Sequence, residues 1–90
     1  MSALLVVRHD VEDFDTWHKV YVSFADVQER FGVKHESVHQ LVDQPKTVLV
    51  LHKFDTVEAA QAFMAAPELQ EAMKTAGVVS EPRAEIYESK

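Results

Sequence analysis

Five histidines in a chain of 90 residues are the side chains best suited to chemistry, because an imidazole titrates near neutral pH. His9 follows the first apolar stretch, and His35, His39 and His52 lie in two later stretches. An imidazole beside a pocket can remove a proton next to a carbonyl group or from an electron-rich aromatic molecule. We therefore take His9, His39 and His52 as candidate catalytic residues.

Three aromatic residues at helical spacing are candidates for the wall of a binding site. Trp17, Tyr21 and Phe24 lie on one face of a predicted helix, where their rings can stack on a flat ligand and the Tyr21 hydroxyl can hydrogen-bond to it. With His35, they are the candidate substrate-binding residues. Packing in the hydrophobic core is the alternative for the three rings, since helix faces are many and pockets are few.

The grouping of three histidines depends on how two predicted strands pair. If residues 43–46, which have the composition of a turn, form the whole loop, His39 opposes Val50 across the hairpin. His35, His39 and His52 would then share one face of the sheet, with about 7–8 Å between diagonal neighbours. A bulge or another loop length would break this group, because a shift of one residue moves a side chain to the other face.

Metal binding is a third use for histidines, but their spacing argues against it. His35 and His39 are about 13 Å apart along a strand that rises about 3.3 Å per residue, which is too far to share an ion directly. The chain has no cysteine, so thiolate ligands and disulfides are excluded. We predict no metal site. The alternative for each histidine is a polar residue at a strand end or edge, and His18, beside the apolar face of its helix, is expected to be exposed.

The elements that position these residues follow from the period of the apolar side chains. Residues 3–8 are apolar on both alternating faces and predict a strand. Apolar residues then recur at the i, i+3, i+4, i+7 spacing of one helical face, which predicts a helix over residues 14–31. Asp13 is a suitable N-cap for this helix, and Gly32 suits the left-handed position that ends one.

A second helical region follows the hairpin. Asp55, with Glu58 three residues later, has the pattern of a capping box. Pro67 fits the first position of a helix, so the region is expected to break near Ala66 and to restart at Pro67. Gly77 is expected to end it.

Three further strands are predicted at residues 33–42, 47–54 and 83–88. The resulting order, β-α-β-β-α-β, predicts a ferredoxin-like α+β fold in one domain over residues 1–90. Its four-stranded antiparallel sheet has the first and third strands in the centre and both helical regions on one face. The two central strands are apolar on both faces, so a monomer would expose an apolar patch. We therefore predict a homodimer that packs sheet against sheet.

Composition limits the partners and the location. The formal net charge of −6 and the lack of a Lys/Arg cluster argue against nucleic acid. No apolar stretch approaches the roughly 20 residues that span a bilayer, and the first residues lack the features of a secretory signal. The cytoplasm is the expected location. A Gly-rich phosphate loop, a nucleophile elbow and an H-E-x-x-H motif are all absent from the sequence, so no cofactor is predicted.

Three segments that cover most of the chain resemble the dimeric α/β-barrel superfamily, and more narrowly its small cyclase and antibiotic-biosynthesis-monooxygenase-like proteins. They are VRHDVEDFDTWHKVY, FGVKHESVHQ and FDTVEAAQAFMAAPELQEAMKTAGV. The resemblance implies a ferredoxin-like fold, a sheet-to-sheet dimer, and a ligand pocket between the sheet and the long helix. The haem-degrading branch of the superfamily is recognised by an asparagine, a tryptophan and a haem-ligating histidine, and this chain has no asparagine.

Two functions remain open from the sequence. The first is a cofactor-independent cyclase or monooxygenase-like enzyme that acts on a small aromatic or polyketide-like molecule. The second is a non-catalytic dimeric protein that binds a small hydrophobic molecule or has an accessory role. An open cavity lined by histidines favours the first, and an interior filled by its own side chains favours the second.

Overall fold

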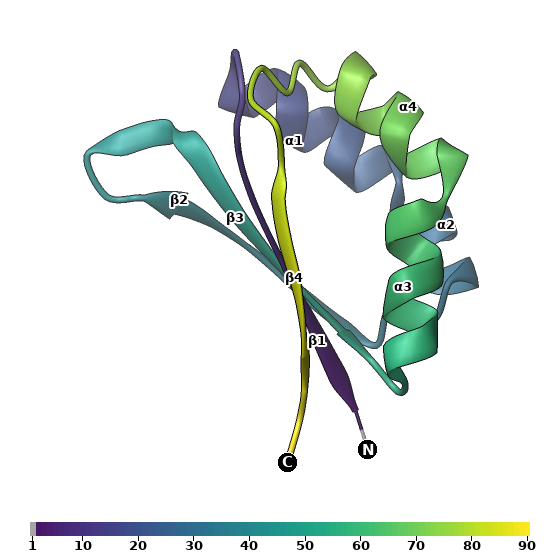
Figure 1. The fold of residues 1–90 in the computed structure, drawn as a ribbon. Coiled ribbons are helices and arrows are strands. Elements are labelled where there is room, and N and C mark those ends of the chain that lie inside the picture. The colour runs from purple at the N-terminus through teal and green to yellow at the C-terminus, as the bar shows by residue number, and fades with distance from the viewer. Residues whose placement is uncertain (1) are drawn as a thin grey trace.

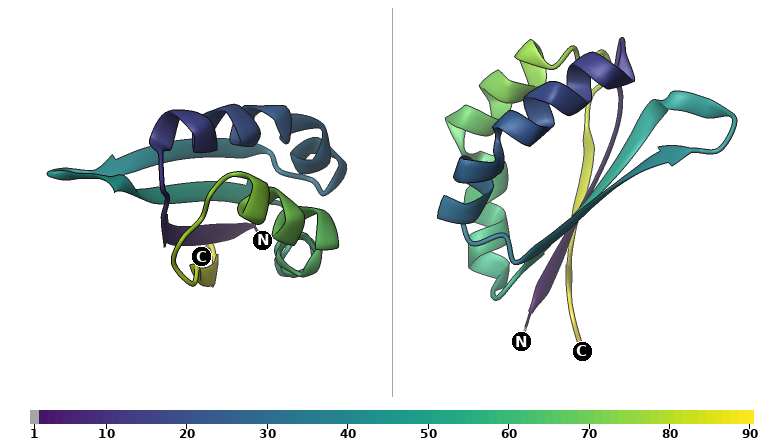
Figure 2. Two further views of the ribbon diagram at one scale, coloured as in Figure 1. Left: turned by 90° about the horizontal axis from the view of Figure 1, so that it is seen from above. Right: turned by 180° about the vertical axis from the view of Figure 1, so that it is seen from behind.

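The computed structural model describes residues 2–90, in which one antiparallel sheet carries all the helices on one face (Figure 1, Figure 2). The strand order is β2-β3-β1-β4. This arrangement confirms the predicted ferredoxin-like fold and the central position of the first and third strands. The elements in chain order are β1 (Ala3–Asp10), α1 (Phe14–Ser23), α2 (Ala25–Arg30), β2 (His35–Leu41), β3 (Gln44–Phe54), α3 (Val57–Ala65), α4 (Pro67–Thr75) and β4 (Arg83–Glu88).

The two central strands follow the period of two that a half-covered sheet requires. In β1, the side chains of Ala3, Leu5, Val7 and His9 face the helices and are buried, whereas the intervening residues are less buried or exposed. The helix-facing residues of β3, from Val48 to Phe54, alternate in the same way. Each fully buried Val, Leu or Phe side chain contributes about 1.5–3 kcal/mol to folding. The buried face of β1 and β3 is therefore the floor of the core.

The predicted helix over residues 14–31 is two helices, because the chain breaks at Phe24. Asp13 caps α1 as predicted, and its carboxylate accepts a hydrogen bond from the Thr16 backbone N–H at 2.9 Å. Near the end of α1, the Ser23 hydroxyl donates to the Val20 carbonyl at 2.6 Å. That carbonyl is the acceptor which the Phe24 N–H would use in a continuous helix. The Phe24 N–H bonds instead to the Tyr21 carbonyl, and the axis turns into α2.

The second helical region begins one residue later than predicted. Thr56, and not Asp55, is the N-cap of α3, and its hydroxyl accepts from the Ala59 N–H at 3.1 Å. The predicted break is confirmed, because Ala66 is extended and Pro67 begins α4. The predicted end is also confirmed, because Gly77 has a φ of 80°, which glycine adopts without strain.

The predicted loop over residues 43–46 is wrong. β3 begins at Gln44, and a register irregularity next to Leu41 accommodates the residues of β3 that have no partner in β2. A tight turn at residues 42–43 replaces the predicted loop, with Asp43 at a φ of 72°, a conformation that Asp tolerates better than most residues. The turn end of β2 and β3 extends away from the helical layer (Figure 1, Figure 2). Beyond the irregularity Val38 opposes Val50, which differs by one residue from the predicted pairing.

The change of register has a direct effect on the histidines. His35 pairs with Lys53 and His39 pairs with Leu49, so both lie on the face of the sheet opposite to the helices. His52 instead pairs with Glu36 and faces the helices. The predicted group of His35, His39 and His52 on one face is therefore wrong. Because side chains alternate along a strand, an error of one residue is enough to separate them.

None of the helices formed by residues 2–90 has the length and apolar character needed to cross a membrane.

Candidate functional site

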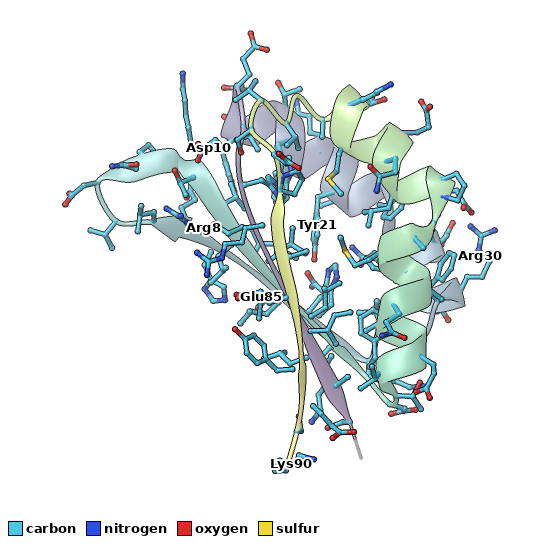
Figure 3. All side chains as sticks on the ribbon, viewed as in Figure 1. Arg8, Asp10, Tyr21, Arg30, Glu85 and Lys90 are labelled. Carbon is cyan, nitrogen blue, oxygen red and sulfur yellow. The ribbon has the colours of Figure 1, made fainter. Side chains whose placement is uncertain are left out.

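A cavity of about 60 Å³ lies between the sheet and the helices. Its floor is formed by the helix-facing side chains of β1 and β3, and its walls come from α1, α2, α3 and α4. Apolar side chains make up most of the lining. Four polar residues, His9, Tyr21, Gln28 and His52, also border the cavity. Figure 3 shows Tyr21 in the space between sheet and helices, with Arg8 and Glu85 on the other side of the sheet.

Local structure explains why these side chains meet. His9 and His52 occupy positions of β1 and β3 that point toward the helices. Trp17, Tyr21 and Phe24 follow the i, i+4, i+7 spacing, so α1 and its C-terminal cap residue Phe24 present all three rings to the cavity. The three rings thus line the cavity and also pack against the core, as the alternative from the sequence expects.

The two histidines lie at opposite ends of the cavity. His52 pairs with Leu5, whereas His9 is four residues farther along β1. Four residues of strand correspond to about 13 Å, which is too far for the imidazoles to share one proton or one ion. Val7 and Val50 pair with each other between them and form an apolar floor. A ligand in the cavity would therefore meet one imidazole at each end.

His52 is hydrogen-bonded on one side only. Its Nε2 atom lies 3.1 Å from the Tyr21 hydroxyl oxygen, and the two rings are stacked with centroids 6.0 Å apart. No residue in the range 2–90 gives its Nδ1 atom a hydrogen bond. Burial lowers the pKa of His52 to about 4, against the opposing effect of the Glu36 carboxylate. The imidazole is therefore neutral at neutral pH and has an unused ring nitrogen.

Tyr21 connects this imidazole to the surface. Its hydroxyl donates a hydrogen bond to Oε1 of Glu36, which is exposed on the edge strand β2. Burial raises the pKa of the Tyr21 hydroxyl, and the bond to Glu36 raises it further. The hydroxyl is therefore protonated over the whole physiological pH range. Tyr21 also stacks on Trp17, with ring centroids 5.0 Å apart.

His9 has no such connection. It is 5% exposed, and neither of its ring nitrogens has a hydrogen-bond partner among residues 2–90. Burial lowers the pKa of His9, although the charge of Asp10 opposes this effect. The ring packs against Trp17 with centroids 5.6 Å apart. Because buried polar atoms are usually hydrogen-bonded in folded proteins, these nitrogens are available to a ligand.

Gln28 adds another unpartnered group. Its side chain is buried on α2, where its amide is near enough to the Tyr21 hydroxyl to lower the pKa of that group. Its Nε2 atom nevertheless has no acceptor within hydrogen-bonding geometry in the described part of the chain. Together with His9 and His52 it surrounds an apolar cavity with polar atoms that have unused hydrogen-bonding capacity. An apolar ligand that carries a few polar groups would match this distribution.

The remaining candidate residues lie elsewhere. His39 is exposed on the outer face of the sheet, where its Nε2 lies 3.0 Å from the Ser37 hydroxyl, and His35 is exposed on the same face. His18 is exposed as predicted and stacks on Phe14. The structure therefore brings together His9, His52 and the aromatic wall, and it leaves out His35 and His39.

Sequence reasoning missed Glu36 and Gln28. The position of Gln28 could have been recognised in the sequence, because a polar residue four positions after Phe24 falls on the apolar face of the helix. Glu36 had none without the correct hairpin register, because only that register places it opposite His52. Within residues 2–90, no three His, Asp or Glu side chains are close enough to hold a metal ion.

Comparison with known proteins places the chain in a family. Residues 2–89 match the family model described as "Domain of unknown function (DUF1330)". The chain belongs to this family. A search of curated proteins by sequence gives no match to this DUF1330 chain.

Solved structures share the fold of the DUF1330 chain at low sequence identity. A protein from Bordetella bronchiseptica assigned to the antibiotic biosynthesis monooxygenases has a TM-score of 0.81 and 13% identity, with 99% of this chain and 97% of that chain covered. SnoaB, a cofactor-independent oxygenase from Streptomyces nogalater, has a TM-score of 0.79 and 13% identity, with 99% and 93% covered. The monooxygenase from the gene ActVA-Orf6 of Streptomyces coelicolor, in complex with nanaomycin D, has a TM-score of 0.70 and 22% identity, with 99% and 88% covered. The predicted resemblance to monooxygenase-like proteins is confirmed at the level of fold.

Proposed function

We propose that this protein is a cofactor-independent cyclase or monooxygenase-like enzyme that acts on a small aromatic or polyketide-like molecule. One observation carries the proposal. A buried, neutral His52 is held by Tyr21 through one nitrogen and has the other nitrogen free, beside an apolar cavity with an aromatic wall. The fold shared with a cofactor-independent oxygenase is consistent with such chemistry.

The reaction begins with a proton transfer. His52 takes a proton from a ring hydroxyl, or from a carbon next to a carbonyl group, and leaves an anion. In a cyclase the anionic carbon attacks a carbonyl group of the same molecule, whereas in an oxygenase the anion reacts with dioxygen. Trp17 and Tyr21 stack on the ring of the substrate, and His9 hydrogen-bonds to an oxygen at its other end.

The size of the cavity requires movement before such a molecule can enter. A cavity of about 60 Å³ is smaller than the roughly 150 Å³ that accommodates benzene. Helix α4 is the wall best able to move, because none of its residues is fully buried. It lies between the extended residue Ala66 and the left-handed Gly77. Displacement of Leu69 and Met73, which line the cavity from α4, would enlarge it.

The same small volume favours a second candidate, a non-catalytic protein that binds a small hydrophobic molecule or has an accessory role. In that case the polar atoms around the cavity would serve recognition only. The two candidates differ in a measurable way, since only the enzyme changes its ligand.

We also propose that two copies pack through the outer face of the sheet. Leu4 and Val6 of β1 and Leu49 and Leu51 of β3 lie on that face and are only partly buried. Adjacent partly exposed apolar residues on two central strands form a patch that a second copy would cover. The patch lies on the side of the sheet away from the cavity, so the dimer would leave access from the helices open.

The test is to incubate the protein with hydroxynaphthalenes and with aromatic diketones whose two carbonyl groups can react with each other, with and without air, and to analyse the products by mass spectrometry. A product formed only in air identifies an oxygenase, and a product formed in both conditions identifies a cyclase. Wild type and His39→Ala should be equally active, whereas His52→Ala should lose activity. Binding without conversion in wild type would favour the second candidate. Conversion that persists in His52→Ala would remove His52 as the base.

A further inference from the structure

Three side chains form a continuous hydrogen-bonded path from the cavity to the exterior. His52 lies at the cavity, Tyr21 bridges from α1, and Glu36 lies exposed on β2. The strands themselves hold the two ends of this path together, because Glu36 and His52 are directly paired across β2 and β3. Both side chains point to the helical face of the sheet, where the Tyr21 hydroxyl lies between them.

The direction of each hydrogen bond follows from the chemistry of the groups. A carboxylate can only accept, so the Tyr21 hydroxyl donates its proton to Glu36. The same hydroxyl oxygen must then accept from His52, which assigns the proton of the neutral imidazole to Nε2. The lone pair consequently lies on Nδ1, the nitrogen that has no hydrogen-bond partner within residues 2–90.

We propose that Glu36 is a positioning residue that, through Tyr21, sets Nδ1 of His52 as the basic atom and provides the exit for the proton that His52 receives. This inference rests on the proposed function for its chemical purpose, but the positioning and the exit exist without a substrate. A carboxylate that orients an imidazole for proton transfer is a general device. Here a phenol hydroxyl is inserted between the two groups.

The proton transfer balances along the path. A proton leaves the ligand and bonds to Nδ1 of His52, while the Nε2–H bond breaks and its proton passes to the Tyr21 oxygen. The original hydroxyl proton of Tyr21 moves to the Glu36 carboxylate, which then releases it to water. The ligand becomes an anion, and His52 and Tyr21 both end neutral. Burial disfavours a charged imidazolium at His52, and this route avoids forming one.

The surroundings of Glu36 allow this release. A second, polar hollow of about 350 Å³ lies between α2 and β2, and Glu36 and Gln28 line it together with Glu29, Lys34 and His35. Gln28 borders both hollows, and Tyr21, which lines the main cavity, is hydrogen-bonded to Glu36, which lines the polar hollow. The charged groups that face the path from β2 and α2 are therefore Glu36 and Glu29, with Lys34 beside them.

Nuclear magnetic resonance of nitrogen-15-labelled histidines tests the positioning without any ligand. At pH 7, His52 should show the Nε2–H tautomer in wild type, with its signals identified by their loss in His52→Gln. Tyr21→Phe removes the acceptor and Glu36→Gln replaces an obligate acceptor by an amide that can also donate, so the Nδ1–H tautomer should grow in both variants. Tyr87→Phe and Glu29→Gln are the matched controls and should leave the tautomer unchanged. An Nδ1–H tautomer in wild type, or identical tautomers in all variants, would overturn the inference.

The exchange of the His52 Nε2 proton with water tests the exit. A buried N–H exchanges slowly, but a path to an exposed carboxylate should accelerate the exchange. We expect exchange to be several-fold slower in Glu36→Gln than in wild type or Glu29→Gln. Equal exchange rates in the three proteins would remove the exit role of Glu36. Because both measurements use the free protein, they can succeed or fail independently of whether any substrate is converted.

Discussion

Glu36 lies directly opposite His52 across β2 and β3, and the Tyr21 hydroxyl links the two side chains. An exposed residue of an edge strand is thereby connected to a buried imidazole at the cavity. The link depends on two kinds of contact. One is the pairing of β2 with β3, and the other is the hydrogen bonds of Tyr21 from α1. Loss of either the register or the helix position would break it.

The stability of the protein should depend on pH through His52. Its pKa is about 4 in the folded protein and 6.5 in the unfolded chain, so between these values the unfolded state binds more protons. The free energy of unfolding should therefore fall as the pH is lowered from about 6.5 to about 4, by up to about 3 kcal/mol. Above pH 7 His52 is neutral in both the folded and the unfolded state, so this loss of stability does not occur. Urea denaturation at several pH values measures the effect.

His52→Gln separates this effect from the titration of carboxylates. Over the same pH range, the free energy of unfolding of His52→Gln should change less than that of wild type. The difference between the two changes is the contribution of His52. His18→Gln, at an exposed histidine, should behave as wild type. Parallel pH profiles for wild type and His52→Gln would show that His52 is not held neutral by burial.

The buried His9 side chain should lower the free energy of unfolding of the protein. Neither of its nitrogens has a hydrogen-bond partner in the described chain, and an unpaired buried polar group costs about 1–3 kcal/mol. His9→Leu should therefore raise the free energy of unfolding by a similar amount, measured by urea denaturation. His18→Leu, at an exposed position, should change it by less than about 0.5 kcal/mol. A His9→Leu variant less stable than wild type would contradict this account.

Shortening a side chain on α4 should favour ligand binding. Met73 lines the cavity, and Met73→Ala removes part of the obstacle that a ring must displace. We expect 1-naphthol to bind Met73→Ala more tightly than wild type by roughly tenfold, or about 1.4 kcal/mol, in a fluorescence titration. Met64→Ala is the matched control, because Met64 packs against the core but does not border the cavity. Equal affinities for the two variants would indicate that ligands enter elsewhere.

A charge on the outer face of the sheet should separate the proposed dimer. Leu51 lies in the middle of that face between Val6 and Ser37, so Leu51→Glu would bury a carboxylate in the interface. Light scattering coupled to size exclusion should give a dimer for wild type and a monomer for Leu51→Glu. Val22→Glu changes a valine that is 58% exposed on α1 and should remain dimeric. A monomeric wild-type protein would rule out the proposed assembly at the concentration tested.

Features with a local cause were predictable from the sequence. The period of apolar residues located the strands and helices, and the cap at Asp13, the restart at Pro67 and the turn at Gly77 each depend on one residue type. The break at Phe24 was not predictable in this way, because the apolar period continues through it and the Ser23 hydroxyl bond to the Val20 carbonyl becomes visible only in the structure.

The candidate site was only partly predictable because it depends on pairing between strands. The tight turn at Asp43 and the irregularity next to Leu41 shift the register by one residue relative to a four-residue loop. This shift places Glu36 beside His52 and moves His35 and His39 to the opposite face. His9, His52 and the aromatic residues were named as candidates from their residue types and from the helical period, but the sequence left open which face of the strands the cavity would border.

The unequal connections of His9 and His52 have a consequence for selectivity. Within residues 2–90, His52 has a hydrogen-bonded route outward, whereas the ring nitrogens of His9 have no partner and its ring packs against Trp17. A planar molecule with two similar hydroxyl groups would therefore ionise at the group next to His52 and retain its proton at the other. We expect any reaction in this cavity to be regioselective, with the choice of atom made by the protein and not by the intrinsic acidity of the molecule.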